Sequence, residues 1–373
     1  MPLPGKRIKA YKESKMKRII IPVAIACTFM AAKAPDISSV DMLIDDKQYL
    51  DAFDILEKAD PDEKDVAITI KKTMLCLDYF AKSIGHGVFS LENLKHNETL
   101  SQIRRSTGKF EIVTFSPEKA LKALIEKYPA RYELHETLGI YYYEVYTHYS
   151  ENSTEKQNET NIGLAKHYIG IALKNNCATA RSFYIMGFIN LDDGYYKEAI
   201  RYFNSSLERN NENPQCHYNL AFAYMKNKDY KAAMRHAAVA LEKYTDLELK
   251  KDAAYFAHRM ATGIQDRDRS MEYAVEYVRL EPRSHKTLKQ IVENYYNTDY
   301  DSDVVRFFET IEGKYKNDDI ALGNICLYRG IYYSDRKQKD RALIDFDRAE
   351  KIFQKIYPAD HEVFKFINES RTR

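Results

Sequence analysis

The chain has 373 residues, enough for two ordinary domains or for one long array of repeated units. Gly and Pro number only 13 and 10, about half of average usage, so a mostly helical protein is expected. The formal net charge is +2, but residues 1–34 hold eight Lys or Arg and one Glu, a charge of +7, which leaves −5 for the rest. A body with that charge has no general electrostatic reason to bind nucleic acid or anionic lipid.

Residues 1–34 have the features of a secretory signal. Three basic residues, Lys15, Lys17 and Arg18, precede an apolar run at 19–32, in the order of the charged and apolar regions of such signals. The run is shorter than the roughly 20 residues that span a membrane comfortably. We therefore expect export, with an uncleaved anchor or a retained cytosolic segment as the alternatives.

The start and the processing of this segment both stay open. Met1 and Met16 are candidate starts, because the residues before Met16 add nothing that a signal needs. A small-x-small cleavage sequence lies at 32–34, although Pro35 after it hinders cleavage. The AIAC sequence that ends at Cys27 is similar to a bacterial lipobox, which makes Cys27 a lipidation candidate. Acylation there would tether the protein to a membrane.

Residues 35–128 read as degenerate helical repeats. Apolar residues recur at helical spacing in 47–61, 65–82 and 116–129. An insertion near 85–115 separates the last two of these helices. Within it, the GHG sequence at 85–87 is expected to end a helix, and the weak alternation of GKFEIVTF at 108–115 predicts a short strand.

Residues 129–357 read as a regular array of helical hairpins. The first hairpin pairs a helix around 135–143 with one around 162–176, and the polar stretch 147–161 between them is expected to be a long surface loop. Two divergent hairpins follow at 249–282 and 284–317. The last residues, 358–373, are expected to be a C-terminal tail.

Two units of this array repeat with a constant offset of 34 residues. Tyr196 and Ala199 in the unit 180–213 recur as Tyr230 and Ala233 in the unit 214–247, and a third clear unit covers 323–356. Such a period is typical of stacked helical hairpins. Small residues are expected where the two helices of a unit cross, with Gly187 facing Ala199 and with Phe183 and Phe203 on either side. Gly194 is expected to end the first helix in the left-handed conformation.

These spacings resemble those of the tetratricopeptide repeat (TPR) family. The small residue of the family at repeat position 8 matches Gly187 and Ala221, and its Ala at position 20 matches Ala199 and Ala233. The resemblance covers most of residues 36–357. It implies an all-α fold, a right-handed α-solenoid in which the first helix of each hairpin lines the concave side.

The resemblance also implies which side chains face the groove, namely repeat positions 2, 5, 9 and 12 together with one adjacent Asn. The candidate partner-binding residues are Ile140, Tyr143, Tyr184, Phe188, Leu191, Tyr218, Asn219, Phe222 and Met225. The same positions hold Glu133, Glu136, Arg181 and Gln215 in these units, and Asn324, Leu327, Ile331 and Ser334 in the last unit.

An aromatic ladder of Tyr184, Phe188, Tyr218 and Phe222 stands out among these groove positions. Exposed aromatic side chains anchor apolar peptides or docked surfaces, and packing of the same rings against a neighbouring helix is the alternative. Some family members grip the C-terminal carboxylate of a peptide with a clamp of Lys and Asn. Only Asn219 fits that clamp here, so this mode is not expected.

The sequence shows no pattern of a catalytic, cofactor or metal site. Ten His are scattered without a ligand spacing, and the STGK at 106–109 lacks the upstream glycine of a phosphate loop. Four widely spaced cysteines are expected to pack as small apolar residues between helices: Cys76, Cys177, Cys216 and Cys326. We therefore expect no catalytic residue, no metal and no cofactor.

Together these features predict a non-catalytic TPR scaffold that binds a protein or peptide at a bacterial cell envelope. The first alternative is a cytosolic TPR adaptor or peptide-responsive regulator that retains residues 1–34. The second is an enzyme whose site lies in the insertions at 85–115 or 147–161. The analogy with envelope TPR lipoproteins rests on the fold alone.

Overall fold

The structure, a computed structural model, describes residues 38–85, 88–107, 110–149, 154–296 and 298–372. The segment 1–34, with the predicted secretory signal and the lipidation candidate Cys27, lies outside these residues. The N-terminal part contains three helices, then a short three-stranded sheet, and then a further helix. One short helix lies between the second and third strands in the sequence. Their bounds are α1 Ser39–Asp45, α2 Tyr49–Ala59, α3 Val66–Tyr79, β1 Ser83–Gly85, β2 Val88–Leu91, α4 Leu100–Arg105, β3 Glu111–Thr114 and α5 Pro117–Lys127.

The rest of the chain is helical. Its bounds are α6 Tyr132–Tyr149, α7 Glu155–Lys174, α8 Ala180–Asp192, α9 Tyr196–Arg209, α10 Pro214–Lys226, α11 Tyr230–Lys243, α12 Leu247–Gly263, α13 Arg267–Leu280, α14 His285–Tyr295, α15 Asp301–Tyr315, α16 Asp319–Asp335, α17 Lys339–Phe353 and α18 Glu362–Arg371.

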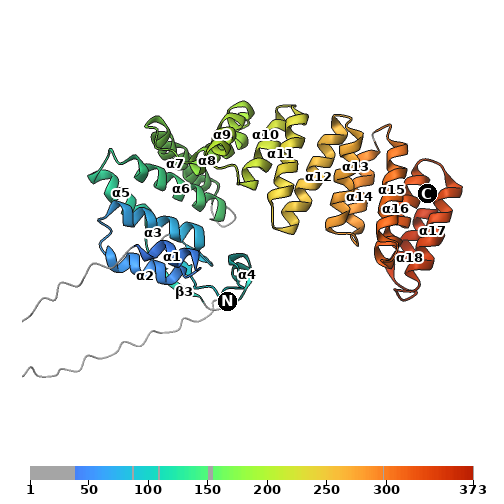
Figure 1. The fold of residues 1–373 in the computed structure, drawn as a ribbon, viewed down its shortest axis with the longest axis horizontal. Coiled ribbons are helices and arrows are strands. Elements are labelled where there is room, and N and C mark those ends of the chain that lie inside the picture. Colours follow the sequence, from blue (N-terminus) through green and yellow to red (C-terminus); the bar gives the residue numbers. More distant parts are fainter. Residues whose placement is uncertain (1–37, 86–87, 108–109, 150–153, 297, 373) are drawn as a thin grey trace, which may run out of the picture.

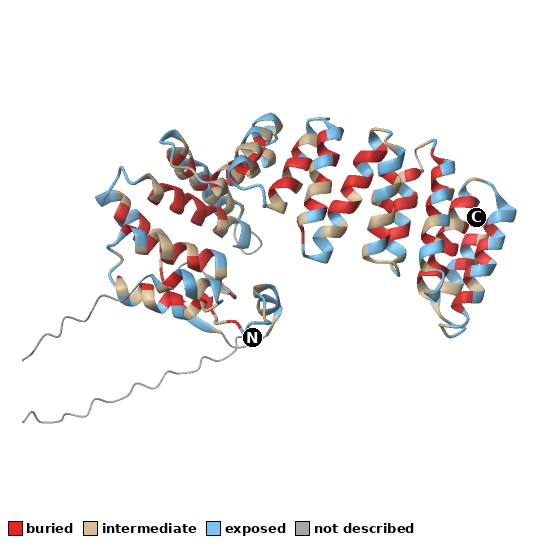
Figure 2. Ribbon diagram, in the orientation of Figure 1, coloured by how far each residue is buried: buried red, intermediate tan, exposed pale blue. Residues whose placement is uncertain are grey.

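The helices form one extended array. Consecutive helices pack into hairpins that stack side by side, with α1 to α3 at one end and α16 to α18 at the other (Figure 1). Each helix buries one stripe against its neighbours and exposes another (Figure 2), as amphipathic helices in a stacked array do. The fold is therefore an all-α solenoid, as the sequence predicts. No helix in the described residues has the length and apolar character that a membrane crossing requires.

The insertion after α3 folds into an antiparallel sheet in the order β1-β2-β3. The predicted strand is present as β3, and Phe89 of β2 pairs with Val113 of β3. Both of these side chains are buried in the N-terminal core, so one face of the sheet is apolar. The expected helix end at 85–87 is wrong, because α3 already ends at Tyr79 and Gly85 belongs to β1. Residues 86–87 lie outside the description.

The polar stretch 147–161 is not a long loop. Helix α6 continues to Tyr149 and α7 already begins at Glu155. Thr154 caps α7: its side chain accepts from the Gln157 backbone N–H, and the Gln157 side chain accepts from the Thr154 backbone N–H. This reciprocal capping starts the helix in a polar sequence.

The hairpin turns share one geometry. Gly194 has a φ of 81°, as predicted, and Lys228, Gln265 and Lys337 occupy the same place after α10, α12 and α16 with φ between 59° and 66°. In each turn two backbone N–H groups return to the last turn of the helix, for example from Lys228 to the Met225 carbonyl and from Asp229 to the Tyr224 carbonyl. This is the Schellman arrangement, which glycine usually serves.

The close helix crossings differ from the predicted detail. A Cβ on Gly187 would lie 2.6 Å from the ring of Phe203, so Gly187 faces Phe203 and not Ala199. Phe203 is fully buried, whereas Phe183 is only half-buried and lies under the guanidinium of Arg209 at 4.0 Å. The small residue therefore accommodates an aromatic ring, and the second aromatic covers the hairpin edge.

Two departures shape the C-terminal end. Helix α14 packs mainly on α16, and α15 on α13 and α16, so the expected hairpin at 284–317 is not a tight pair. The residues expected as a C-terminal tail form α18, which packs on α16 and α17. Ile367 of α18 is fully buried and belongs to the C-terminal core. These two features border the largest cavity discussed below.

Candidate partner-binding site

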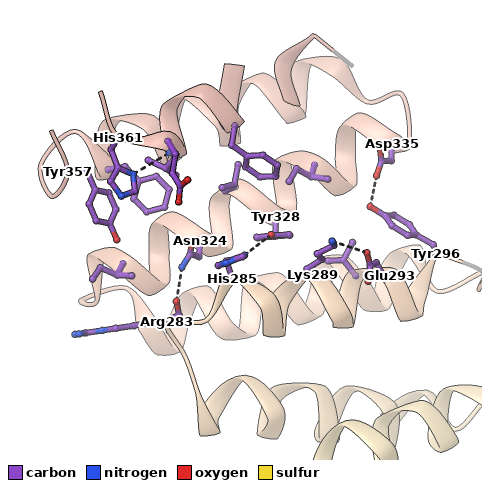
Figure 3. A pocket seen from close by; sticks show the side chains of 18 residues that line it. Arg283, His285, Lys289, Glu293, Tyr296, Asn324, Tyr328, Asp335, Tyr357 and His361 are labelled. Carbon is purple, nitrogen blue, oxygen red and sulfur yellow. Dashed lines mark hydrogen bonds and ion pairs between the residues drawn. The ribbon is translucent and has the colours of Figure 1, made fainter. Parts of the chain in front are cut away.

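A cavity of about 810 Å³ lies between the first helices α14 and α16 and is walled on one side by the residues around α18. This volume falls within the range of about 300–1,000 Å³ that is usual for ligand pockets. Figure 3 shows the cavity with α14 on one side and α16 on the other. Its apolar residues are Val292, Ile320, Leu327, Ile331, Phe353, Val363 and Phe366.

Helical periodicity explains which residues line the cavity. On α14 the lining positions are His285, Lys289, Val292 and Glu293, followed by the C-cap residue Tyr296. They come from successive turns of the helix, which are three or four residues apart. Residues at such spacing lie on one face of a helix. The lining positions on α16 have the same spacing: Ile320, Asn324, Leu327, Tyr328, Ile331 and Asp335.

Polar contacts join the two helices across the floor. The Tyr328 hydroxyl lies 3.2 Å from His285 Nδ1, and the Asn324 side-chain amide donates to the Arg283 carbonyl at 2.9 Å (Figure 3). Rings of His285 and Tyr328 are stacked with centroids 6.4 Å apart. These contacts hold α14 and α16 in a defined relation, so the cavity is preformed.

The ends of the cavity differ in charge. At one end the Tyr296 hydroxyl donates to the Asp335 carboxylate (Figure 3). Burial, and then this hydrogen bond, raise the pKa of Tyr296 well above its usual value, so the phenol stays neutral. At the other end Arg283 donates to Asp318 at 2.9 Å. Burial opposes ionisation of Asp318, but Arg283 and the backbone N–H groups of Ala321 and Ile320 together outweigh it and lower the pKa of that carboxyl.

The wall beside α18 is aromatic. The rings of Tyr357 and His361 stack with centroids 4.1 Å apart, and His361 Nδ1 accepts from the Val363 backbone N–H at the start of α18. Phe366, one turn further on, is 37% exposed although it lines the cavity. An accessible aromatic side chain beside an apolar floor is a typical anchor for a bound segment.

Three of the groove positions implied for the last unit lie in this cavity: Asn324, Leu327 and Ile331 line it, whereas Ser334 does not. The upstream positions behave differently. Ile140 and Tyr143 are only 4% and 6% exposed, so their expected exposure in a groove is wrong. Neighbouring helices cover them, and Tyr143 packs edge-on against Phe188 with ring centroids 5.5 Å apart.

The aromatic ladder is largely engaged in packing. Tyr184 accepts from the Asn219 side chain at 3.0 Å and lies 5.9 Å from the Phe203 ring. Tyr218 and Phe222 both lie against Phe256 of the next hairpin, at 5.7 and 6.4 Å. Leu191 and Met225 are half-buried beside small apolar clusters. Phe222 keeps 37% exposure, so it is the most accessible ring of the ladder.

Two charged groove positions hold hairpins together. Glu136 is buried and accepts from the Thr179 backbone N–H and the Ser182 hydroxyl, each at 2.6 Å, which caps α8 from outside. Arg181 donates to Asp78 at 2.6 Å and to Glu144 at 2.7 Å. Arg181 and Tyr184 also line a smaller cavity of about 260 Å³ between α6 and α8. These charges join successive units and leave little free for a partner.

Sequence reasoning missed the contributions of α14 and α18 to the larger cavity. The signal was present in HEVFKF at 361–366, where apolar residues follow a capping residue, and in the Tyr-rich segments around 295–300 and 328–333. The sequence does not show that these segments line one cavity, because that depends on which helices lie next to each other. In the described residues no three His, Cys, Asp or Glu side chains are grouped to hold a metal ion. The cysteines there are unpaired, and Cys177 alone among them is not buried.

One comparison with known protein families finds the repeat in part of the chain. Residues 190–254 match the family model of the tetratricopeptide repeat. No curated protein matches the chain in a sequence search.

Solved TPR structures are similar at low identity. A TPR protein from Parabacteroides merdae is 18% identical, with 69% of this chain and 91% of that one covered and a TM-score of 0.35. The C-terminal part of a TPR protein from Cytophaga hutchinsonii is 14% identical, with 67% and 92% covered and a TM-score of 0.41. YrrB, a TPR protein with an unusual peptide-binding site, is 15% identical, with 54% and 97% covered and a TM-score of 0.33. The family match places tetratricopeptide repeats at residues 190–254, and the described helices on either side of them stack in the same way.

Proposed function

We propose that the chain is a non-catalytic scaffold that binds a segment of a partner protein in the cavity between α14 and α16. One observation carries this proposal: a preformed cavity of about 810 Å³, with an apolar floor and polar ends, lies between two successive first helices. Pockets with an apolar lining and a few fixed polar groups are the usual form of binding sites. The accessible ring of Phe366, with the half-buried Tyr357 in the same wall, supplies an anchor.

The aromatic ladder supports a second, weaker contact with the same partner. Phe222 is accessible, and Lys226 lies over its ring at 5.2 Å. The other rings mainly hold the hairpins at a fixed spacing. An array that is rigid in this way presents its binding surface without paying much conformational entropy on binding.

We also propose that the scaffold acts after export, at a bacterial cell envelope. The support is the basic and apolar segment at 15–32 and the lipobox-like sequence at Cys27. A cytosolic adaptor with the same cavity is the alternative. Cell fractionation with intact-mass measurement distinguishes them, because only export removes residues 1–26 or 1–34, and acylation adds the mass of lipid chains.

Site-specific photocrosslinking tests the binding site. A photoreactive phenylalanine replaces Phe366 in the cavity wall, and in a matched protein it replaces Ile344, which is 67% exposed on α17 outside the cavity. We expect a discrete partner adduct from position 366, absent from position 344 and abolished by Ile331→Asp. Equal adducts from both positions, or an adduct that survives Ile331→Asp in a protein of unchanged helicity, would contradict the proposal.

A further inference from the structure

The cavity has an excess of negative charge once its ion pairs are accounted for. Arg283 is engaged by Asp318 at 2.9 Å, and Lys289 lies 3.7 Å from Glu293 one turn later on α14. Within the described residues, neither Asp335 nor Glu362 has a cation in ion-pair range, although both line the cavity. An occupant would therefore meet two carboxylates that no cation of the described chain neutralises.

The end of the cavity at Asp335 is the more structured of the two acidic positions. The Tyr296 hydroxyl binds one carboxylate oxygen of Asp335 and so orients the group (Figure 3). Glu293 lies three residues before Tyr296, on the same face of α14. The nearest cation in sequence, Arg336, is engaged elsewhere, since it pairs with Asp301 at 2.9 Å and lies over the Tyr332 ring.

The pair between Lys289 and Glu293 does not close this end. Both side chains are more than half exposed, at 59% and 52%, and exposed ion pairs four residues apart on a helix contribute little to stability. A cation of a partner can replace Lys289 at little cost. It would then meet two carboxylates from two helices, which strengthens a charged hydrogen bond in a partly enclosed site.

The remaining lining requires an apolar companion to that cation. Val292, Leu327 and Ile331 form the floor next to the acidic end, and Phe353, Val363 and Phe366 form the wall beyond it. Val292, Leu327 and Phe353 are already buried, so the apolar surface left to cover belongs to Ile331, Val363 and Phe366. Covering it is favourable only for apolar groups. Acidic or uncharged polar segments would bury the floor without compensating Asp335.

We infer that the partner segment is an apolar peptide with a Lys or Arg beside its anchor residues, and that this cation lies between Glu293 and Asp335. This inference rests on the proposed binding of a protein segment in the cavity and specifies its chemistry. The apolar side chains of the segment cover Ile331 and Phe366. Its cation donates to Oδ1 of Asp335, the carboxylate oxygen that Tyr296 does not occupy.

A phage-displayed library of random dodecapeptides tests the inference with the full chain as bait. Selection runs in parallel on the unaltered protein, on Ile331→Asp, and on the isosteric double variant Glu293→Gln with Asp335→Asn. Glu309→Gln with Asp340→Asn is the matched control, because both of these carboxylates are exposed outside the cavity. Peptides from the unaltered protein are then synthesised, and their Kd values are measured by fluorescence polarisation at low and high NaCl.

We expect peptides that Ile331→Asp does not recover and that carry Lys or Arg next to aliphatic or aromatic residues. Their Kd should rise at least about 10-fold on the Glu293→Gln, Asp335→Asn protein, as for loss of a charge-assisted hydrogen bond, and stay unchanged on the control. The inference is overturned if the peptides that need Ile331 are acidic or neutral, or if their Kd is the same on the double variant. In that case the proposed function still stands. Recovery of no peptide that depends on Ile331 overturns both.

Discussion

A fully buried imidazole at the centre of a polar cluster shows how one residue ties three helices together. His258 of α12 donates from Nδ1 to the Ser270 carbonyl of α13 at 2.9 Å, and its Nε2 accepts from the Asn294 side chain of α14 at 2.9 Å. The two contacts specify a neutral ring with the proton on Nδ1. Thr262 and Tyr295 complete the cluster through the Ser270 hydroxyl. The cluster therefore requires His258 to remain uncharged.

This requirement predicts acid sensitivity. Burial lowers the pKa of His258 to about 4 from 6.5, so between these values the unfolded chain binds a proton that the folded chain does not. Stability is then lost as the pH falls from about 6.5 toward about 4, by on the order of 2 kcal/mol between pH 7.5 and pH 5. His258→Gln keeps a donor and an acceptor but cannot be protonated.

Urea unfolding at both pH values measures the effect. We expect a smaller loss for His258→Gln than for the unaltered protein. Some loss remains in both, because burial also lowers the pKa of His236 to about 4. An equal loss in the two proteins would show that His258 does not contribute.

At the scale of elements, the hairpin turns share a backbone but not a residue type. The left-handed residue is Gly194 after α8, but Lys228 after α10 and Lys337 after α16. A residue with a side chain is strained in this conformation by about 1 kcal/mol relative to glycine. The turns nevertheless form because packing of the paired helices outweighs that cost. The 34-residue spacing of the hairpins is therefore kept even where the left-handed turn position is not a glycine.

Lys228→Gly is expected to stabilise the second hairpin by up to about 1 kcal/mol, since it removes the strain at φ 66°. Arg235→Gly, on the exposed face within α11, is the matched control and should destabilise by about 1 kcal/mol. Denaturation midpoints of the two variants report the difference. If both variants lose stability equally, the turn strain inferred from φ is not significant.

At the scale of the whole molecule, the described residues form two large apolar cores joined by thin packing. One core extends from α1 to α8 and the other from α11 to α18. Between them lie only two small clusters, one of which consists of Ala199, Phe203, Cys216, Leu220 and Ala223. In a stacked array each unit contacts only its neighbours, so stability is a sum of local terms. The middle of the solenoid should therefore open before its ends.

Phe203→Ala should cost about 3–5 kcal/mol, because the ring is fully buried in the small cluster. Hydrogen exchange followed by mass spectrometry should show lost protection in α8 to α11 and unchanged protection in α16 and α17. Phe346→Ala, in the C-terminal core, should give the reverse pattern. A uniform loss along the chain would instead mean that the array unfolds as one cooperative unit.

Much of this architecture is readable from the sequence because it is local. Apolar spacing specifies α8 to α11 and their register, and three of the groove positions of the last unit, Asn324, Leu327 and Ile331, line the cavity. The charge of a segment and its likeness to an export signal are also properties of the chain alone.

Only the tertiary structure decides what each exposed-looking residue contacts. Ile140, Tyr143 and Glu136 occupy groove positions by number but are covered by neighbouring helices, and Gly187 faces Phe203 because the helices cross at that point. The cavity itself arises from residues of α14, α16 and α18 that are up to about 80 positions apart. Periodicity reports which face of a helix is apolar, but the stacking of the units determines which part of that face remains open to a partner.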